Sequence, residues 1–252
     1  MKILTMKFGG TSVADIDRIR AVRDIISDEV KDGWNVVAVV SAMSKETNKL
    51  IDLAKQAGVE SLVDPEYDSL ISTGEDVSSS LLAIALNSIE VSARSWRGWQ
   101  VPIRTDSFHS NAKIEEIKTH QIINSFKEGV KVAVVSGFQG IEEAGRITTL
   151  GRGGSDTSAV AIAAAIDAER CDIYTDVSGI YTTDPRIKRN ASKLKKISFE
   201  EMLEMASLGA NVLQTRAVEL AMRHKVPIRV LNSFLKEEGT LVCDEEEIME
   251  KN

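Results

Sequence analysis

Short apolar runs rich in β-branched residues alternate with longer segments of helical periodicity along the chain. The runs that predict β-strands are Ile3–Phe8, Val36–Val40, Val132–Val135, Ile173–Thr175 and Ile228–Leu231, with weaker candidates at Val101–Arg104 and Thr240–Val242. Strands that alternate with helices in this way are typical of parallel sheets whose strands are joined by crossover helices.

The helical segments indicate how these layers pack. From Asp15 to Val30, apolar residues recur at helical spacing with Asp and Arg on the other face, which predicts an amphipathic helix. The run Ala159–Ile166 is apolar on every side, which predicts a helix buried between the sheet and other elements. No Pro/Ser-rich linker or repeat divides the chain. The pattern therefore predicts one doubly wound α/β domain with two lobes.

Composition and charge narrow the classes of function. The 252 residues are 43% hydrophobic and 27% charged, which is typical of a soluble globular protein with a large core. The net charge of -7 argues against a nucleic-acid partner, so an anionic ligand needs a local cluster of positive charge. The start is too short and polar for a signal peptide, and no apolar run reaches membrane-spanning length. Because the two cysteines, Cys171 and Cys243, also suit a reducing compartment, we expect a cytoplasmic protein without a membrane partner.

Residues suited to ligand binding or catalysis lie in the loops that follow the predicted strands, where ligands bind in doubly wound sheets. The first loop, 7–12, places Lys7 before Gly9 and Gly10, so backbone N–H groups and a fixed cation could meet a phosphate. Its spacing is not that of a Walker A loop. A simple strand-to-helix turn with an exposed lysine explains the same residues, and for this loop alone that explanation is favoured.

Two further loops have structural explanations of their own. The loop 41–48 is rich in hydroxyls and amides, and by itself it favours a helix N-cap over a binding site. In the loop 72–76, Glu75 and Asp76 precede a helical pattern around 81–86, where carboxylates favour the helix dipole. Alternatively, Glu75 could bind an ammonium group.

The last two loops carry the most polar groups. The stretch TTLGRGGSDTSA, residues 148–159, precedes the buried helix; its Arg152 offers a planar fork for a carboxylate or phosphate, and its Asp156 should pair with a cation. The stretch 174–186 offers a carboxylate for a ribose, an aromatic face for a base and an arginine for phosphates. Turn formation and core packing also account for Asp176 and Tyr181.

Taken in order, these motifs resemble the signatures of the aspartate kinases, which belong to the amino-acid kinase superfamily. The similar segments are KFGGTSV at 7–13, STGE at 72–75, GRGGSD at 151–156 and TDVSGIYTTDPR at 175–186. The segment 92–106 also resembles the middle part of this family, which argues against an acetylglutamate or uridylate kinase. The resemblance implies a three-layer αβα sandwich with a mainly parallel central sheet. It runs from about Lys7 to the end of the chain. We expect a catalytic domain over residues 1–244, with an acidic tail at 245–252 that frays.

The implied reaction is phosphoryl transfer from ATP to the side-chain carboxylate of L-aspartate, the first step towards lysine, threonine and methionine. This carboxylate is already ionised at neutral pH, so the nucleophile needs no general base. The three histidines lie outside the motifs, in agreement with this chemistry. Positioning and positive charge must instead bring two anions together. Mg²⁺ is expected to be held mainly by the phosphates, without a dedicated protein metal site.

The resemblance also implies roles for individual residues. The amino-terminal lobe should bind the amino acid and the carboxyl-terminal lobe the nucleotide. Lys7 should contact the transferring phosphoryl group, and Asp156 should orient Lys7. The aspartate pocket is expected to consist of Ser41, Thr47, Glu75, Phe138 and Arg152, and the nucleotide site of Lys7, Gly9, Gly10, Thr175, Asp176, Tyr181, Arg186 and Asn211.

Two departures from the family pattern affect these expectations. Asn211 stands where many relatives carry a phosphate-binding lysine, and an amide supplies donors without charge. Typical aspartate kinases also continue into small regulatory domains, so feedback inhibition through such domains is not predicted from this chain. A homodimer or a separate regulatory subunit is compatible with the resemblance. The alternatives are a catalytically weak nucleotide-binding homologue and a kinase for another small carboxylic acid.

Overall fold

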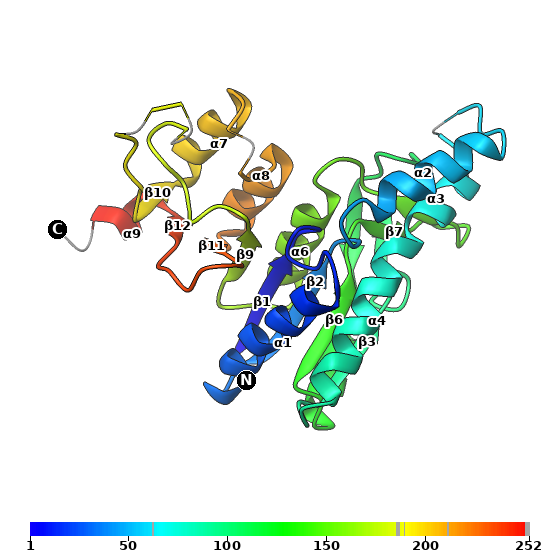
Figure 1. Ribbon diagram of the computed structural model, residues 1–252, viewed down its shortest axis with the longest axis horizontal. Helices are drawn as coiled ribbons and strands as arrows, with labels where there is room; N and C mark the ends of the chain where they lie inside the picture. The colour runs from blue at the N-terminus through cyan, green and yellow to red at the C-terminus, as the bar shows by residue number, and fades with distance from the viewer. Residues whose placement is uncertain (62, 185–186, 189, 211, 250–252) are drawn as a thin grey trace.

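A parallel sheet of eight strands forms the centre of the molecule (Figure 1). The computed structural model describes residues 1–61, 63–184, 187–188, 190–210 and 212–249. The strands lie in the order β10-β12-β11-β9-β1-β2-β6-β3, and every neighbouring pair is parallel except β11 with β12. Their bounds are β1 (Ile3–Phe8), β2 (Asn35–Val40), β3 (Ala93–Trp96), β6 (Val132–Ser136), β9 (Cys171–Thr175), β10 (Lys196–Ser198), β11 (Ile228–Asn232) and β12 (Thr240–Cys243).

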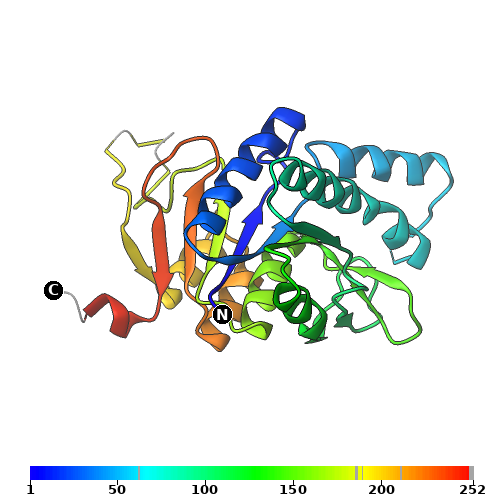
Figure 2. The ribbon, with the colours of Figure 1, turned by 90° about the horizontal axis from the view of Figure 1, so that it is seen from below.

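Helices cover both faces of this sheet, which gives three layers (Figure 2). On one face lie α1 (Ile16–Lys31) and α4 (Thr73–Asn87), and on the other α5 (His120–Lys127), α6 (Gly154–Ala165), α7 (Phe199–Ser207) and α8 (Thr215–His224). None of the described helices is both long and apolar enough to cross a membrane. The predicted αβα sandwich with a mainly parallel sheet is confirmed.

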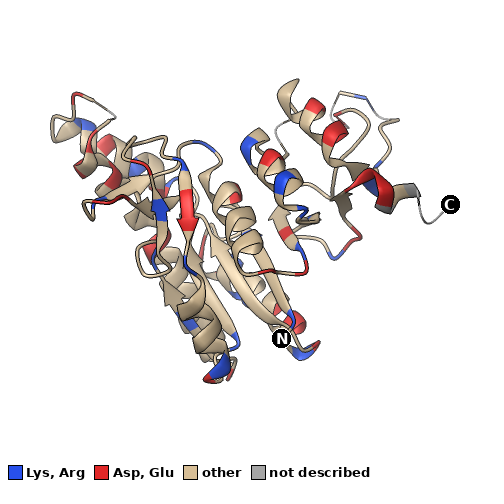
Figure 3. Ribbon diagram, turned by 180° about the vertical axis from the view of Figure 1, so that it is seen from behind, with Lys and Arg blue, Asp and Glu red and all other residues tan. Residues whose placement is uncertain are grey.

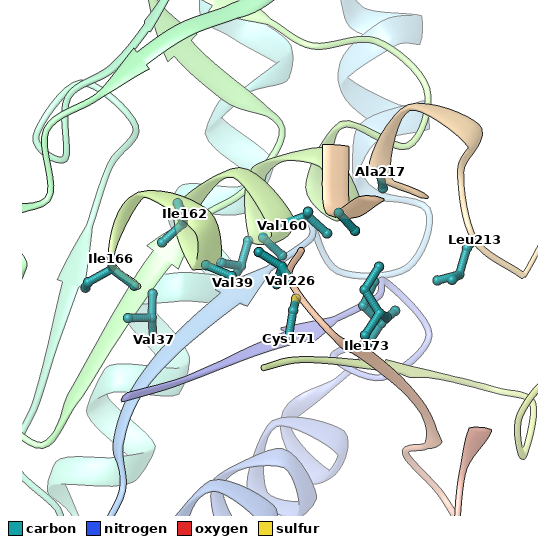
Figure 4. Close-up of a cluster of buried hydrophobic side chains, with 14 of the residues drawn as sticks. Val37, Val39, Val160, Ile162, Ile166, Cys171, Ile173, Leu213, Ala217 and Val226 are labelled. Carbon is teal, nitrogen blue, oxygen red and sulfur yellow. The ribbon is translucent and has the colours of Figure 1, made fainter. Parts of the chain in front are cut away.

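The central strands are apolar along their length because both faces are buried. In β2, Val36, Ala38 and Val40 pack towards α1 and α4, while Val37 and Val39 pack towards α6. Figure 4 shows Val37 and Val39 beside helix α6, in the same cluster as side chains from β9. Each fully buried aliphatic side chain contributes about 1.5–3 kcal/mol, so this two-sided burial holds the strands in their register.

A second, smaller sheet and two helices form one end of the molecule. The sheet has the order β5-β4-β7-β8, and helices α2 and α3 lie at the same end in Figure 1. The bounds are α2 (Glu46–Gln56), α3 (Pro65–Ile71), β4 (Ile103–Thr105), β5 (Ile114–Ile117), β7 (Gln139–Ile141) and β8 (Ile147–Thr149). The carboxyl-terminal elements α7, α8, β10 and β12 lie at the opposite end.

The acidic end of the chain begins with a short helix. Where the sequence predicts a frayed tail over 245–252, the structure has α9 (Glu245–Met249), and 250–252 lie outside the described residues. Its first turn carries Glu245 and Glu246, which favour the positive end of the helix dipole. Fraying in solution stays a prediction.

Candidate active site

The loops at the carboxyl ends of β1, β2 and β9 meet because these three strands are parallel neighbours. Lys7, on β1, places its Nζ 2.6 Å from Oδ1 of Asp156 in the first turn of α6. The two side chains are only 12% and 9% exposed, so each charge compensates the other away from water. The ion pair expected from the sequence is present, and it fixes the position of the lysine relative to α6.

The glycine loop after β1 leaves backbone donors free beside this lysine. The N–H of Gly9 donates to the carbonyl of Tyr174 at 3.4 Å, while the carbonyl of Gly9 accepts from Ser12 and Val13. The N–H groups of Gly10 and Thr11 donate to no other described residue. A Cβ on Gly9 would lie 3.5 Å from Lys7 Nζ. Free amides beside an ammonium group form a suitable cradle for phosphate oxygens.

Glu75 is buried against the loop that follows β2. Its Oε1 accepts from the N–H of Ala42 at 3.0 Å, and its Oε2 has no partner among the described residues. Burial raises the pKa of Glu75 to about 8, although the N–H of Ala42 opposes the shift. Glu75 lies within the first turn of α4, which begins at Thr73, and not before the helix as the sequence analysis placed it. A buried carboxylate oxygen without a donor is suited to a cationic ligand.

The N-cap interpretation of loop 41–48 is wrong. Helix α2 begins at Glu46, and its N-cap residue, Lys45, has a φ of 67° and makes no side-chain capping bond. The loop instead turns sharply towards the glycine loop, since a Cβ on Gly10 would lie 3.0 Å from the carbonyl oxygen of Ala42. Ser41 is half-buried at the end of β2, and Thr47 is half-buried in the first turn of α2.

Phe138 packs against the start of α6 from the turn between β6 and β7. Its φ is 68°, its N–H donates to Ser158 Oγ at 3.1 Å, and its carbonyl accepts from the N–H of Leu150 at 2.9 Å. A Cβ on Gly154 would come within 2.9 Å of the Phe138 ring. A left-handed conformation at a bulky residue is held by such surrounding contacts and is concentrated at functional sites.

Arg152 lies in the turn between β8 and α6. The flanking glycines, Gly151 and Gly153, have φ angles of 73° and 72°, and the N–H of Gly154 closes the turn onto the carbonyl of Gly151 at 3.0 Å. The exposed guanidinium makes no hydrogen bond or ion pair with any described residue. It is therefore free to bind a carboxylate or phosphate with two parallel N–H groups.

We expect Gly153→Ala to lower the free energy of unfolding by about 2–4 kcal/mol, because strained backbone and crowding add together. A Cβ at this position would lie 2.0 Å from Cγ of Gln214. The matched control is Gly145→Ala, where φ is 82° but nothing lies within 4 Å of the added atom, so about 1 kcal/mol is expected. Urea unfolding measures both, and equal losses would contradict the crowding.

The residues expected at the nucleotide lie at the carboxyl end of β9. Thr175 Oγ1 donates to Asp176 Oδ1 at 3.2 Å, and the carbonyl of Thr175 accepts from the N–H of Ser233. Tyr181 is half-buried and pairs with Lys193 in an isolated bridge. Arg186 and Asn211, which the sequence analysis placed at the phosphates, lie outside the described residues.

Sequence reasoning missed two polar networks that support these loops. Asp68 of α3 is fully buried and is bonded by residues from the 106–112 loop and from β8. Asp76 of α4 accepts from Ser136 Oγ at 2.8 Å and from Gln139 Nε2 at 3.1 Å. The partners are 41 to 81 residues away from Asp68 and Asp76 along the chain, so no local pattern connects them.

His109 belongs to the first of these networks although it lies outside every motif. Its Nδ1 is 2.9 Å from Asp68 Oδ2, and Ser110 Oγ donates to Asp68 Oδ1. Both side chains therefore meet the same carboxylate, and the group is organised around Asp68.

Positive charge at the site comes from individual side chains. Basic and acidic residues are interspersed over both ends of the molecule (Figure 3), and the net charge is -7. Within the described part of the chain, no group of three or more His, Cys, Asp or Glu could hold a metal ion. Lys7, the free amides of its loop and Arg152 provide a local attraction for anions.

The whole chain is similar in sequence to known aspartate kinases. The chain is 55% identical over 252 residues to an aspartate kinase from Stutzerimonas stutzeri and 52% identical over 252 residues to an aspartokinase from a Bacillus species. Both alignments cover 100% of this chain but only 61% of the relative, so the chain spans less than two thirds of these proteins.

Solved structures agree with the fold. An aspartate kinase from Synechocystis superposes with a TM-score of 0.85 at 46% identity, covering 96% of this chain and 40% of that one. Aspartokinase III from E. coli, in complex with aspartate and ADP, gives 0.86 at 32%, covering 96% and 65%. The sequence also matches the amino acid kinase family over residues 2–232. Since this match takes in nearly all of the sheet and every loop described above, the chain belongs to the amino acid kinase family.

Proposed function

We propose that the chain carries the active site of an aspartate kinase, which transfers the γ-phosphoryl group of ATP to the side-chain carboxylate of L-aspartate. The observation that carries the proposal is that two groups, the Arg152 guanidinium and Glu75 Oε2, have no partner among the described residues, in a chain 55% identical to an aspartate kinase. An α-amino acid presents one carboxylate and one ammonium group, which these two residues complement. A nucleoside monophosphate carries no ammonium group, so Glu75 favours the amino acid.

Lys7 supplies the fixed positive charge for phosphoryl transfer. The acceptor carboxylate is ionised at neutral pH, so catalysis requires alignment and charge compensation and no proton abstraction from the nucleophile. Asp156 holds the ammonium group of Lys7 in place at 2.6 Å, and the free N–H groups of Gly10 and Thr11 bind phosphate oxygens. Phe138, Ser41 and Thr47 line the amino-acid pocket in this proposal.

We assign ATP to the carboxyl-terminal lobe. Thr175 and Asp176 would bind the ribose, Tyr181 the base, and Arg186 with Asn211 the phosphates. The solved E. coli relative was captured with aspartate and ADP, which supports both substrates. Mg²⁺, when bound, neutralises charge on the phosphates; it keeps most of its water and takes few protein ligands.

The direct test is a hydroxamate assay, in which hydroxylamine traps the acyl phosphate formed from ATP, Mg²⁺ and L-aspartate. A signal that depends on both substrates supports the proposal, and a signal no greater than that of Lys7→Ala would overturn it. A panel of glutamate, N-acetylglutamate and UMP identifies a different acceptor. Calorimetric binding of ATP and aspartate without turnover would favour the catalytically weak homologue, and restored turnover in Asn211→Lys would support that reading.

The pKa of Glu75 predicts how aspartate binding depends on pH. Burial raises this pKa to about 8, so the empty site holds mostly the neutral acid at neutral pH. An ammonium ligand favours the carboxylate, so binding below pH 8 must release a proton. We expect the aspartate KM to fall about tenfold as the pH rises from about 6.5 to 8. Glu75→Gln should raise KM and remove this dependence, and a flat wild-type profile would contradict the assignment.

We further propose that the protein acts in the cytoplasm, where ATP and aspartate are available. The two cysteines, Cys171 and Cys243, are buried and form no disulfide, as suits a reducing compartment. Assembly as a homodimer, or with a separate regulatory subunit, is compatible with the family. Size-exclusion chromatography with light scattering, with and without lysine, tests both.

A further inference from the structure

We propose that Asp68 is a positioning residue, which holds the loop that carries Arg152 and thereby sets the affinity for the α-carboxylate of the substrate. The part that concerns the substrate rests on the function proposed above. Asp68 is the fourth residue of the short helix α3, its side chain is fully buried, and it belongs to none of the sequence motifs.

The carboxylate of Asp68 joins three segments that are distant in the sequence. Oδ1 accepts from Thr149 Oγ1 at 2.6 Å and from Ser110 Oγ at 3.2 Å. Oδ2 accepts from the N–H of Thr149 at 2.9 Å, from the N–H of Ser110 at 2.9 Å, and lies 2.9 Å from His109 Nδ1. Helix α3, the 106–112 loop and the end of β8 are therefore bonded to one charged group, which makes strong hydrogen bonds in a buried site.

The path from Asp68 to Arg152 is short. Thr149 is the last residue of β8, and its N–H and hydroxyl are both bonded to Asp68, while its carbonyl accepts from the N–H of Ala112 at 2.9 Å. Leu150 is then fixed to the carbonyl of Phe138, and the turn around Arg152 begins at Gly151. The Arg152 side chain is held by none of the described residues, so within this part of the chain its position depends on the backbone anchor and on the start of α6.

Helix α3 also contacts Phe138, which the proposed function assigns to the amino-acid pocket. Tyr67 and Ile71 of α3 form a small apolar cluster, and Phe138 packs against it. The same turn of helix thus holds the Arg152 loop through Asp68 and the Phe138 ring through apolar contact. A shift of about 1 Å in such a support can cost a hundredfold in an active site, so this helix is well placed to set substrate affinity.

The decisive variant is Asp68→Asn, which keeps the size of the side chain but turns an amide NH₂ towards groups that donate hydrogen bonds. We expect the aspartate KM to rise about tenfold or more while the ATP KM changes by no more than about twofold. Thr149→Val removes only the 2.6 Å hydroxyl contact and should give the same pattern at about threefold. If Asp68→Asn does not fold, Thr149→Val still tests the positioning role of Asp68.

Asp172→Asn is the matched control. Asp172 is equally buried, but it pairs with Arg170 and Arg229 on the sheet face turned away from α6. This variant should lose stability without separating the two KM values. If Asp68→Asn raises both KM values equally, or lowers stability alone as Asp172→Asn does, Asp68 is structural and the proposal is wrong.

Amide hydrogen exchange separates this proposal from the proposed function. Amides in the segment 149–153 should exchange about tenfold faster in Asp68→Asn than in the wild type, and Asp172→Asn should leave them unchanged. Unchanged exchange in Asp68→Asn would overturn the anchoring role. If the wild type phosphorylates no aspartate, the proposed function fails, and the exchange rates still decide whether Asp68 holds the Arg152 loop.

Discussion

Replacing Lys7 with alanine should lower kcat for aspartate phosphorylation by about three orders of magnitude. In the phosphoryl-transfer transition state, charge spreads over oxygens that must lie beside fixed positive groups, and Lys7 lies on the strand that leads into the loop with the free amides of Gly10 and Thr11. The substrates bind in part through other residues, so the effect should fall mainly on kcat. Initial rates in the hydroxamate assay at saturating ATP and aspartate measure it.

Two controls separate lost charge from lost folding. Lys7→Ala leaves the buried Asp156 carboxylate without its partner, which by itself costs about 3–5 kcal/mol of stability. The double variant Lys7→Ala/Asp156→Asn removes that uncompensated charge, and it should regain stability without regaining turnover. Lys2→Ala removes an exposed lysine just before the same strand, where it lies over the Trp34 ring, and should keep full activity. Wild-type kcat in Lys7→Ala would refute its role.

The parallel core was the most predictable part of the fold. Strand β1 spans Ile3–Phe8 as the hydrophobic run predicts, and β11 differs from its predicted range by one residue. Central parallel strands are buried on both faces, so their sequences are continuously apolar and easy to recognise. The edge strands β5 and β8 of the smaller sheet left no such signal because they are three or four residues long and partly exposed.

Helix starts were less predictable because tertiary contacts override local propensity. Helix α6 begins at Gly154, five residues before the apolar run that predicted it at Ala159. Gly154, Ser155 and Asp156 are weak helix formers, yet the ion pair of Asp156 with Lys7 and the packing of Phe138 on Gly154 hold them in the first turn. The same override placed Glu75 inside α4.

The site was predictable where its residues share a motif and unpredictable where they meet across the fold. Lys7, Gly9 and Gly10 follow one strand, and Arg152 and Asp156 flank one turn, so their neighbourhoods can be read from short segments. The carboxylate of Asp68, in contrast, meets Thr149 from 81 residues away. Only folding brings such groups together. The spacing of hydrophobic residues in a single sequence does not predict contacts between residues that lie so far apart along the chain.

Replacing Arg152 with alanine should weaken aspartate binding by about 2–5 kcal/mol, seen as a large rise in the aspartate KM with the ATP KM unchanged. The guanidinium bonds to none of the residues that the structure describes, so its two parallel donors are available to the α-carboxylate of the substrate. For the same reason the variant should unfold at the wild-type urea concentration. Arg152→Lys keeps the charge but loses the planar fork, so its aspartate KM should lie between that of the wild type and that of Arg152→Ala.

The matched control for this prediction is Arg146→Ala. Arg146 lies just before β8, as Arg152 lies just after it, but it pairs with Glu66 on the surface, and such exposed pairs contribute little. Its loss should leave both KM values unchanged. An unchanged aspartate KM in Arg152→Ala would refute the assignment, whereas a rise in the ATP KM alone would move Arg152 to the phosphates. Because both arginines are exposed and carry the same charge, a difference between the two variants would come from the position of Arg152 between Gly151 and Gly153, not from net charge.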